Sequence, residues 1–405
     1  MPTELQARRW AYGALFFLAA TLSFSIAFFE MASGVLIASA AWGWFRSEKR
    51  SFSRDLLVTL CGVYFLTVLL SLTQTVYWAA SIRGVFKVLK NIAIFLSVIF
   101  VLDSVPKLRR LVEAMLWISV ALGVDALIQS VLGHDPIRQR PMTAYWGETY
   151  RVTATFGHAN NFAAYLSLVI PLTLGLLWGR EHFFGSKKRW VLWAGLGVLF
   201  LSLVWTYSRS AWAAVLAATA ILAVLKKNGG LLILLIAGLM LGALFAPVKV
   251  KQRFLSLGDP SSGTVVERKI LWKESFRMIA QNPWLGLGVN TYAVNEPHFK
   301  SKEVYTDNQY AHNGYLQMAA EIGLLGLLSF VLCIGYGLIS AGITLFRTRE
   351  PFVGAAGLGL LAGLLAFLMH AATDTDLQST LLINLFWFSM GVLWAAKRLA
   401  DSARV

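Results

Sequence analysis

The sequence predicts an all-α integral membrane protein built as a single polytopic domain over residues 1–405. The first observation is composition: 57% of the residues are hydrophobic and the mean hydropathy is +0.62. Soluble domains are less apolar than this. The second observation is that apolar runs close to the length of a membrane span recur along the whole chain, which favours about twelve transmembrane helices. The only two cysteines lie inside such runs, so a disulfide framework is not expected.

Each expected span is an apolar run bounded by polar or basic residues. The expected spans are about 11–28, 30–46, 56–74, 88–103, 111–132, 161–179, 190–207, 210–225, 229–246, 312–345, 353–371 and 378–396. Glu30 is interpreted as the turn between the first two spans and as the only acidic residue near mid-membrane. The longest polar interval, residues 247–311, separates the ninth span from the tenth and is expected to be a large, partly helical loop.

The distribution of positive charge orients these spans. With the N-terminus in the cytoplasm, every inside loop is short and basic, as the positive-inside rule requires. The net charge is +15, and many cations remain on the outer side, where that rule does not explain them. They are Arg83, Lys87, Lys90, Arg138, Arg140, Arg151, Arg209, Lys249, Lys251, Arg253, Arg268, Lys269, Lys273 and Arg277. An anionic substrate on the outer face is the simplest cause.

The 247–311 loop has internal structure of its own. Apolar residues recur at helical spacing over residues 265–281, which predicts a helix with Arg268 on its polar face. The segment Asn282-Pro283-Trp284 is expected to end this helix. Residues 285–288, Leu-Gly-Leu-Gly, predict a tight backbone turn.

His312 is the first candidate for chemistry, because it lies at the outer mouth of a long apolar segment. The positive partial charge of a helix N-terminus disfavours the imidazolium, so the ring stays able to accept a proton. His312 is therefore a candidate general base. The alternative is a capping or interfacial histidine with a satisfied hydrogen bond.

Two arginines are candidates for binding a diphosphate. Arg209 lies in a bare turn between two apolar segments, where an arginine needs water or a partner. Its planar fork suits phosphate oxygens, although a snorkelling interfacial arginine is the alternative. Arg268 lies on the loop helix, where the competing interpretation is a solvated face with Glu267 and Glu274 as local counter-charges.

Polar residues also gather at the start of the 161–179 span. Arg151, Asn160 and Asn161 are candidates for binding sugar hydroxyls, and helix capping by either asparagine is the alternative. Asp374 and Asp376 form an Asp-x-Asp pattern in the last outside turn. A hydrated turn with one aspartate paired to an arginine is favoured over a metal site, so no metal ligand is predicted.

Several of these segments resemble the O-antigen ligase family of the wider ligase/polymerase superfamily. His312-Asn313 is followed by Gly323-Leu324-Leu325-Gly326, which is similar to the family's signature. Three further segments agree in order: residues 155–161, residues 208–212, and the Arg268 helix followed by residues 282–288. Together with the topology, the resemblance covers most of the chain.

The resemblance implies an inverting glycosyltransferase of the membrane-embedded C type in a bacterial inner membrane. Such ligases move a polysaccharide from undecaprenyl diphosphate to lipid A–core on the periplasmic face, without a metal or cofactor. His312 would be the base and Arg209 and Arg268 the diphosphate-binding cations. Arg151, Asn160, Asn161, Asn313 and Asp374 would bind substrate. Asn313 and Asp374 are both open as the residue that orients the imidazole.

Membrane lipids are the other expected partners, and no nucleic acid is expected. Two alternatives within the enzyme class are an O-antigen polymerase and a ligase that glycosylates proteins. A transporter of lipid-linked sugars is the alternative outside it. A transporter is expected to show charges at mid-span and inverted repeats, and neither is clear in the sequence.

Overall fold

The computed structural model describes residues 3–21, 25–47, 55–142, 144–146, 149–178, 183–226, 228–231, 233, 248–255, 263–300 and 310–403. Within these ranges, nine helices are long and apolar enough to cross a membrane. They are α2 (Ile26–Arg46), α3 with its 3-10 extension η1 (Leu56–Gln74), α4 (Trp78–Val101), α5 (Val105–Leu132), α6 (Ala159–Leu177), α7 (Ser186–Trp205), α13 (Gly314–Phe346), α14 (Pro351–Ala371) and α15 (Thr380–Ser402).

The remaining elements are shorter or more polar. Helix α1 (Glu4–Thr21) carries three charged residues, and α8 (Arg209–Leu225) is a shorter apolar helix. The others are α10 (Val248–Leu255), α11 (Gly263–Gln281), α12 (Tyr292–Asn295), η2 (Ala154–Phe156), η4 (Glu296–His298), β1 (His134–Asp135), β2 (Arg140–Pro141), β3 (Ala144–Trp146) and β4 (Thr149–Tyr150). The strands form two antiparallel pairs, β1–β2 and β3–β4.

The expected helices are present wherever the structure describes the chain, with shifted ends. The predicted span 229–246 lies almost wholly outside the described residues. Helices α1 and α2 both start earlier than the first two predicted spans, and Ser25 caps α2 by accepting from the Phe28 amide. Glu30 is therefore inside α2, and its interpretation as a turn was wrong.

Charged groups inside the helices also differ from expectation. The Glu30 carboxylate lies 2.5 Å from the Lys90 ammonium of α4, so Lys90 has a counter-charge within the protein and needs no external anion. Asp125 lies within α5 and Glu321 within α13, so Glu30 is not alone as a helix-borne acid. Such groups need internal partners in a membrane.

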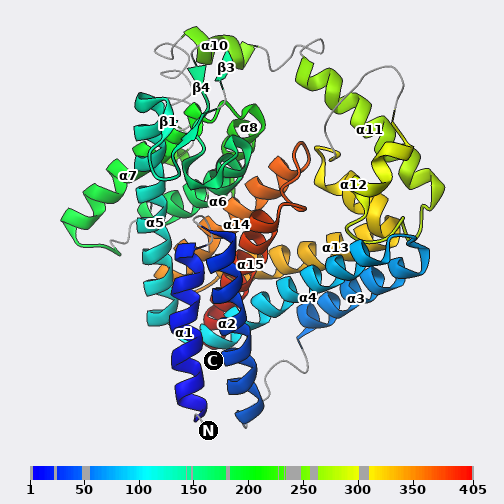
Figure 1. Cartoon of the computed structure of the whole chain (residues 1–405). Coiled ribbons are helices and arrows are strands. Elements are labelled where there is room, and N and C mark those ends of the chain that lie inside the picture. The colour runs from blue at the N-terminus through cyan, green and yellow to red at the C-terminus, as the bar shows by residue number, and fades with distance from the viewer. Residues whose placement is uncertain are drawn as a thin grey trace.

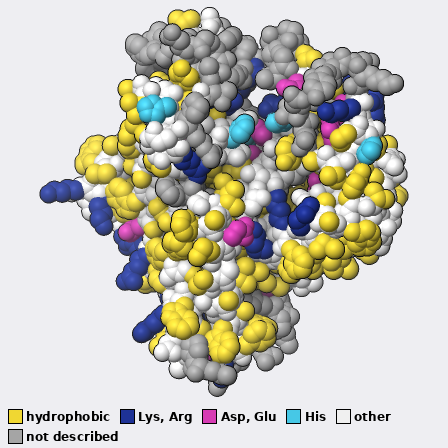
Figure 2. Space-filling model, viewed as in Figure 1, with side chains coloured by type: hydrophobic (Ala, Val, Ile, Leu, Met, Phe, Trp, Pro, Cys, Tyr) yellow, Lys and Arg dark blue, Asp and Glu magenta, His cyan; other side chains and the backbone are white. Residues whose placement is uncertain are grey.

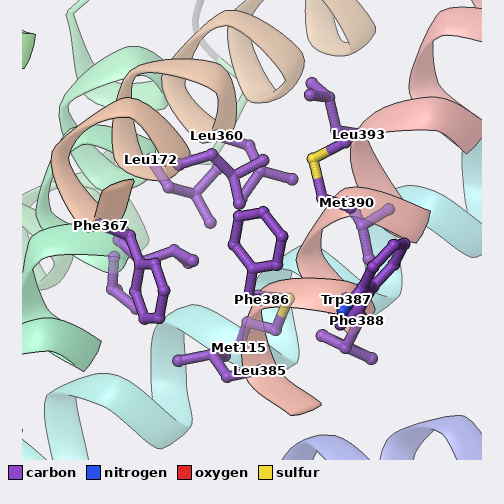
Figure 3. Close-up of a cluster of buried hydrophobic side chains, with 14 of the residues drawn as sticks. Met115, Leu172, Leu360, Phe367, Leu385, Phe386, Trp387, Phe388, Met390 and Leu393 are labelled. Atoms are coloured by element: carbon purple, nitrogen blue, oxygen red, sulfur yellow. The ribbon is translucent and has the colours of Figure 1, made fainter. Parts of the chain in front are cut away.

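Helices α6, α14 and α15 form the buried centre of the bundle (Figure 1). α6 and α14 approach closely because they meet at glycines. A Cβ atom at Gly363 would lie 2.1 Å from the Leu168 carbonyl oxygen, so no larger residue fits there. Figure 3 shows the adjoining apolar cluster, in which Phe367 of α14 and Phe386 of α15 stack at 5.6 Å between ring centroids.

The outer surfaces of α3, α4 and α13 carry apolar side chains that would face water in a soluble protein (Figure 2). Helices in a bilayer show this pattern, because lipid solvates apolar side chains. The exposed side chains are Val63, Leu66, Ile82, Phe86, Leu89, Leu328, Val331, Leu332 and Ile339.

Helix α13 is interrupted by Gly323, whose φ of +72° and ψ of +178° are not helical. The turn after α11 fills the gap. The amides of Leu287 and Gly288 donate to the carbonyls of Ala320 and Glu321, and the Leu324 amide donates to Pro283. Backbone groups freed by the break are thus satisfied by another segment, as burial requires.

This pairing explains the Leu-Gly-Leu-Gly motif. Gly286 and Gly288 have positive φ, and a Cβ atom at Gly286 would lie 2.5 Å from the Glu321 backbone. The predicted helix 265–281 is confirmed as α11, and its predicted end after Gln281 is confirmed. The pairing docks the loop on the first half of α13 and so holds α11 near His312.

Candidate active site

Side chains from the start of α6, the N-cap of α8, the residue before the α13 cap and α11 contact Asp374 in the α14–α15 turn or His370 just before it. In the space-filling view, histidine and acidic side chains gather in a recess in the upper part of the molecule (Figure 2). The sequence-predicted site residues come from every one of these segments. The fold therefore brings together side chains that are far apart along the chain.

Asp374 is the centre of this cluster. Its carboxylate lies 3.5 Å from His312 Nδ1 and 3.8 Å from Arg268 Nη2. The Asn160 side-chain amide donates to it at 2.5 Å, and the Thr375 backbone amide donates at 2.8 Å. The side chain is only 6% exposed. One buried carboxylate therefore joins α6, α11 and the residues before α13.

The environment of Asp374 keeps it ionised. Burial by itself would raise the pKa of this carboxyl. The adjacent His312 ring, the charges of His370 and His312, and the Thr375 amide outweigh burial and hold the pKa well below its usual value. At neutral pH the group is an acceptor for its neighbours' protons.

His312 precedes α13 in a strained backbone conformation, with φ of +46°. Such a conformation persists only where the surroundings impose it. Its Nδ1 atom is buried and lies 3.5 Å from the Asp374 carboxylate, which is longer than a good hydrogen bond. Within the described residues, Nδ1 has no other hydrogen-bond partner. The side chain as a whole is 26% exposed. Nδ1 is therefore covered, and the exposed quarter of the side chain belongs to its other atoms.

Asn313 forms the N-cap of α13. Its side-chain oxygen accepts from the backbone amides of Tyr315 and Leu316, both at 3.0 Å. The structure thus places Asp374, and not Asn313, against the His312 imidazole. Of the two residues that the sequence left open for orienting the imidazole, Asp374 is the one that lies next to the ring.

Arg151 and Asn160 form an arm that reaches Asp374. Arg151 donates from Nε to the Thr206 carbonyl at 2.7 Å and from Nη2 to the Asn160 side-chain oxygen. Asn160 then donates to Asp374. Asn161 follows in the first turn of α6 and is half-buried. The N-cap position of α6 belongs to His158, so the alternative in which an asparagine caps this helix was wrong.

Arg209 is the first residue of α8 and is 9% exposed. It follows a tight turn in which Tyr207 has φ of +52°. The Ser208 hydroxyl contacts His370 Nε2, and His370 Nδ1 contacts Asp376. Sequence reasoning assigned no role to Ser208 or His370, because nothing local links them. The sequence feature that could have indicated Ser208 and His370 is that both are polar residues at the ends of apolar helices.

Both aspartates of the Asp-x-Asp pattern face basic side chains. Asp374 faces His312 and Arg268, and Asp376 lies 2.6 Å from His370. Across the part of the chain that the structure describes, no group of three or more histidine, cysteine or acidic residues is arranged to hold a metal ion.

Sequence comparison adds an observation about the segment that contains Arg209, Arg268 and His312. Residues 194–331 match the O-antigen ligase family model. The match covers about a third of the chain and supports the O-antigen ligase/polymerase superfamily. No curated protein matches the chain. The superfamily consists of glycosyltransferase-like ligases and polymerases, which suggests an enzyme.

The O-antigen ligase match includes Arg209, Arg268, His312 and Asn313. Asp374, which contacts Arg268 and His312, lies in the α14–α15 turn, and Asn160, which donates to Asp374, lies in α6; both are outside the matched segment. The candidate site is therefore completed by parts of the chain that the family match does not cover.

Proposed function

We propose that this protein is an O-antigen ligase, which transfers a polysaccharide from undecaprenyl diphosphate to lipid A–core. In this proposal the enzyme lies in a bacterial inner membrane with its site facing the periplasm. The observation that carries the proposal is the Asp374 carboxylate held between His312 and Arg268. It brings a base and a phosphate-binding cation to one point, as transfer from a diphosphate requires.

The acceptor hydroxyl is a weak nucleophile and needs a base within reach. In this proposal the negative charge of Asp374 next to Nδ1 favours the tautomer with its proton on that nitrogen, and Nε2 takes the hydroxyl proton. Asp374 stays ionised, so it stabilises the imidazolium that forms. Base assistance of this kind contributes about 100- to 10,000-fold to rate.

Departure of the diphosphate develops negative charge on its oxygens. Arg268 has a side chain that is a quarter exposed, so a ligand can reach it. Arg209, at the start of α8, adds a second guanidinium and the positive end of a helix dipole. In a site shielded from water these charges stabilise the leaving group without a metal.

The donor carbon then undergoes one displacement. The hydroxyl oxygen forms the new glycosidic bond from the face opposite the breaking carbon–oxygen bond, and the electron pair leaves with undecaprenyl diphosphate. His312 takes the hydroxyl proton. A single displacement inverts the anomeric configuration. Asn160, Asn161 and Arg151 line the α6 side and are the proposed contacts for sugar hydroxyls.

Acceptor choice separates this function from its alternatives. Purified protein in liposomes would receive a lipid-linked glycan with one of three acceptors: lipid A–core, a second lipid-linked glycan, or a pilin peptide. Ligation predicts glycan on lipid A–core with inverted configuration. Growth of the lipid-linked glycan would instead identify a polymerase, and glycosylated peptide a protein ligase.

His312→Ala serves as the matched control in each arm of this assay. Movement of labelled donor across the liposome with no glycosidic product in any arm would overturn the enzyme proposal in favour of transport. Product formed equally by His312→Ala and by the unaltered protein would overturn the base assignment alone.

A further inference from the structure

A second acid–histidine pair lies beside the first and is more deeply buried. His370, near the end of α14, is fully buried, and its Nδ1 lies 2.6 Å from Asp376. Its Nε2 lies 3.2 Å from the Ser208 hydroxyl. Ser208 is 5% exposed and Asp376 is 1% exposed. Three polar side chains from three segments thus form one buried chain, here called the Asp376–His370–Ser208 chain.

These partners are the same residue types as in a serine hydrolase triad, but access argues against nucleophilic attack. A nucleophile must bring its own oxygen onto the reacting carbon, and the short Ser208 side chain is almost wholly covered. Binding of a diphosphate by Arg209 requires only that the tip of its long side chain be reached. The transfer reaction proposed above already uses a hydroxyl of the acceptor as its nucleophile. Positioning is the role that burial leaves for these three residues.

Ser208 occupies the N-cap position of α8, yet its side chain does not cap the helix. An N-cap serine normally accepts from an amide in the first turn. Here its hydroxyl contacts His370 and lies 3.5 Å from the Ser210 hydroxyl. The tertiary contact has replaced the local one, which indicates that the direction of this turn is set by His370.

The turn before α8 is held from its other side as well. The Thr206 carbonyl accepts from Arg151 Nε at 2.7 Å, and the Thr206 hydroxyl accepts from the Ser208 amide at 3.3 Å. Between them Tyr207 has a positive φ of +52°, a strained conformation for a non-glycine residue. Contacts on both flanks therefore hold the backbone that leads into Arg209.

We infer that the Asp376–His370–Ser208 chain positions Arg209 for the diphosphate of the donor. Arg209 directly follows Ser208, and Asp376 lies two residues after Asp374, which faces His312. One short turn between α14 and α15 therefore sets both the base, through Asp374, and the cation, through Asp376. This inference rests on the proposed function, in which Arg209 binds the leaving group.

The test compares binding of undecaprenyl diphosphate with binding of undecaprenyl monophosphate to the full-length protein in nanodiscs. Ser208→Ala is expected to weaken diphosphate binding by about tenfold or more, the cost of one charged hydrogen bond. Binding of the monophosphate should change less, because the fork of Arg209 then has fewer oxygens to hold. Ser208→Thr keeps the hydroxyl and should rescue the preference for diphosphate.

Two reference variants separate positioning from general loss of stability. Ser202→Ala removes another buried serine, on α7, whose hydroxyl contacts backbone carbonyls of α5 and α7. It should leave the diphosphate preference unchanged. Arg209→Lys removes the planar guanidinium itself. Its loss of diphosphate affinity is the largest that mispositioning of Arg209 could cause. Asp376→Asn should resemble Ser208→Ala.

The outcomes distinguish this inference from the proposed function. A Ser208→Ala protein that binds diphosphate within about twofold of the unaltered protein would overturn the positioning role, and so would a loss equal to that of Ser202→Ala. Diphosphate binding that depends on Ser208 in a protein that transfers no glycan would overturn the ligase proposal and leave positioning intact. Absence of diphosphate binding by the unaltered protein would overturn both.

Discussion

Asp374 lies 3.5 Å from the Nδ1 atom of His312, although one residue belongs to the α14–α15 turn and the other precedes α13. The same carboxylate accepts from Asn160 of α6 and lies 3.8 Å from Arg268 of α11. A buried carboxylate needs such partners to remain charged. Its position makes Asp374 the residue through which the proposed base and the proposed cation act together.

Replacing the proposed base removes proton transfer and leaves the fold intact. His312→Ala is expected to lower the rate of glycan transfer by about 100- to 10,000-fold, while thermal unfolding changes little because the side chain is partly exposed. Initial rates with saturating donor and lipid A–core measure the effect. His298→Ala, in η4, is the control histidine and should keep the full rate. A full rate in His312→Ala would contradict the base assignment.

Asp374→Asn keeps the shape of the side chain and removes its charge. We expect kcat to fall by at least about tenfold and by up to about 10,000-fold, the cost of losing an orienting carboxylate in a histidine-based site. The loss should appear in kcat more than in KM, because the carboxylate acts on the transition state. Steady-state kinetics over a range of acceptor concentrations check this. A rise in KM alone would assign Asp374 to acceptor binding.

The depressed pKa of Asp374 also predicts how stability depends on pH. A carboxyl whose folded pKa lies below its unfolded value stabilises the fold above the unfolded value of about 4 and loses that contribution as the pH falls further. The Tm difference between the unaltered protein and Asp374→Asn should thus be present at about pH 5 and shrink as the pH falls below about 4. A difference that grows as the pH falls from about 5 to about 3 would contradict the sign of this shift.

The break in α13 depends on a residue without a side chain. At Gly323 a Cβ atom would lie 2.1 Å from the Trp284 carbonyl oxygen, and φ is +72°. We expect Gly323→Ala to destabilise the protein by more than about 2 kcal/mol, since this positive-φ, extended-ψ conformation, essentially restricted to glycine, costs about 1–3 kcal/mol before any clash. Gly335→Ala in the same helix is the matched control, because nothing lies within 4 Å of its Cβ position. Thermal unfolding in detergent measures both, and equal Tm values would contradict the docking of the 283–288 turn.

Metal removal tests the source of positive charge at the site. Asp374 and Asp376 both face basic side chains, so the proposed mechanism takes its charge from Arg209 and Arg268. Transfer in the presence of EDTA should stay within about twofold of the untreated rate. Loss of activity that added Mg²⁺ or Mn²⁺ restores would contradict the metal-independent mechanism and bring the two aspartates back as ligands.

Local sequence predicted the helices better than their number or ends. The length and apolarity of each run are local properties, so α3, α13 and α14 were recognised directly. Glu30 was misassigned because a single acid in an apolar run looks like a turn, while its partner Lys90 is on another helix. The Arg268 helix was predicted from its periodicity, and its end was predicted from Asn282-Pro283.

The candidate site divides in the same way. The residue types with suitable chemistry, His312, Arg209 and Arg268, could be chosen from the sequence because they are polar groups at the ends of apolar segments. Their partners could not be chosen, since Asn313 is next to His312 in sequence but caps α13, whereas Asp374 makes the contact. Sequence proximity does not decide which of two polar groups faces a third.

By itself the sequence determined the membrane class, the helical segments and the chemical groups at their ends, because each depends on residues close together in the chain. Only the tertiary structure decided that Asp374 faces His312 and that Asp376 reaches Ser208 through His370. The physical reason is that the α14–α15 turn is placed by the close packing of α14 on α6, at positions such as Gly363, and by the docking of α11 on α13.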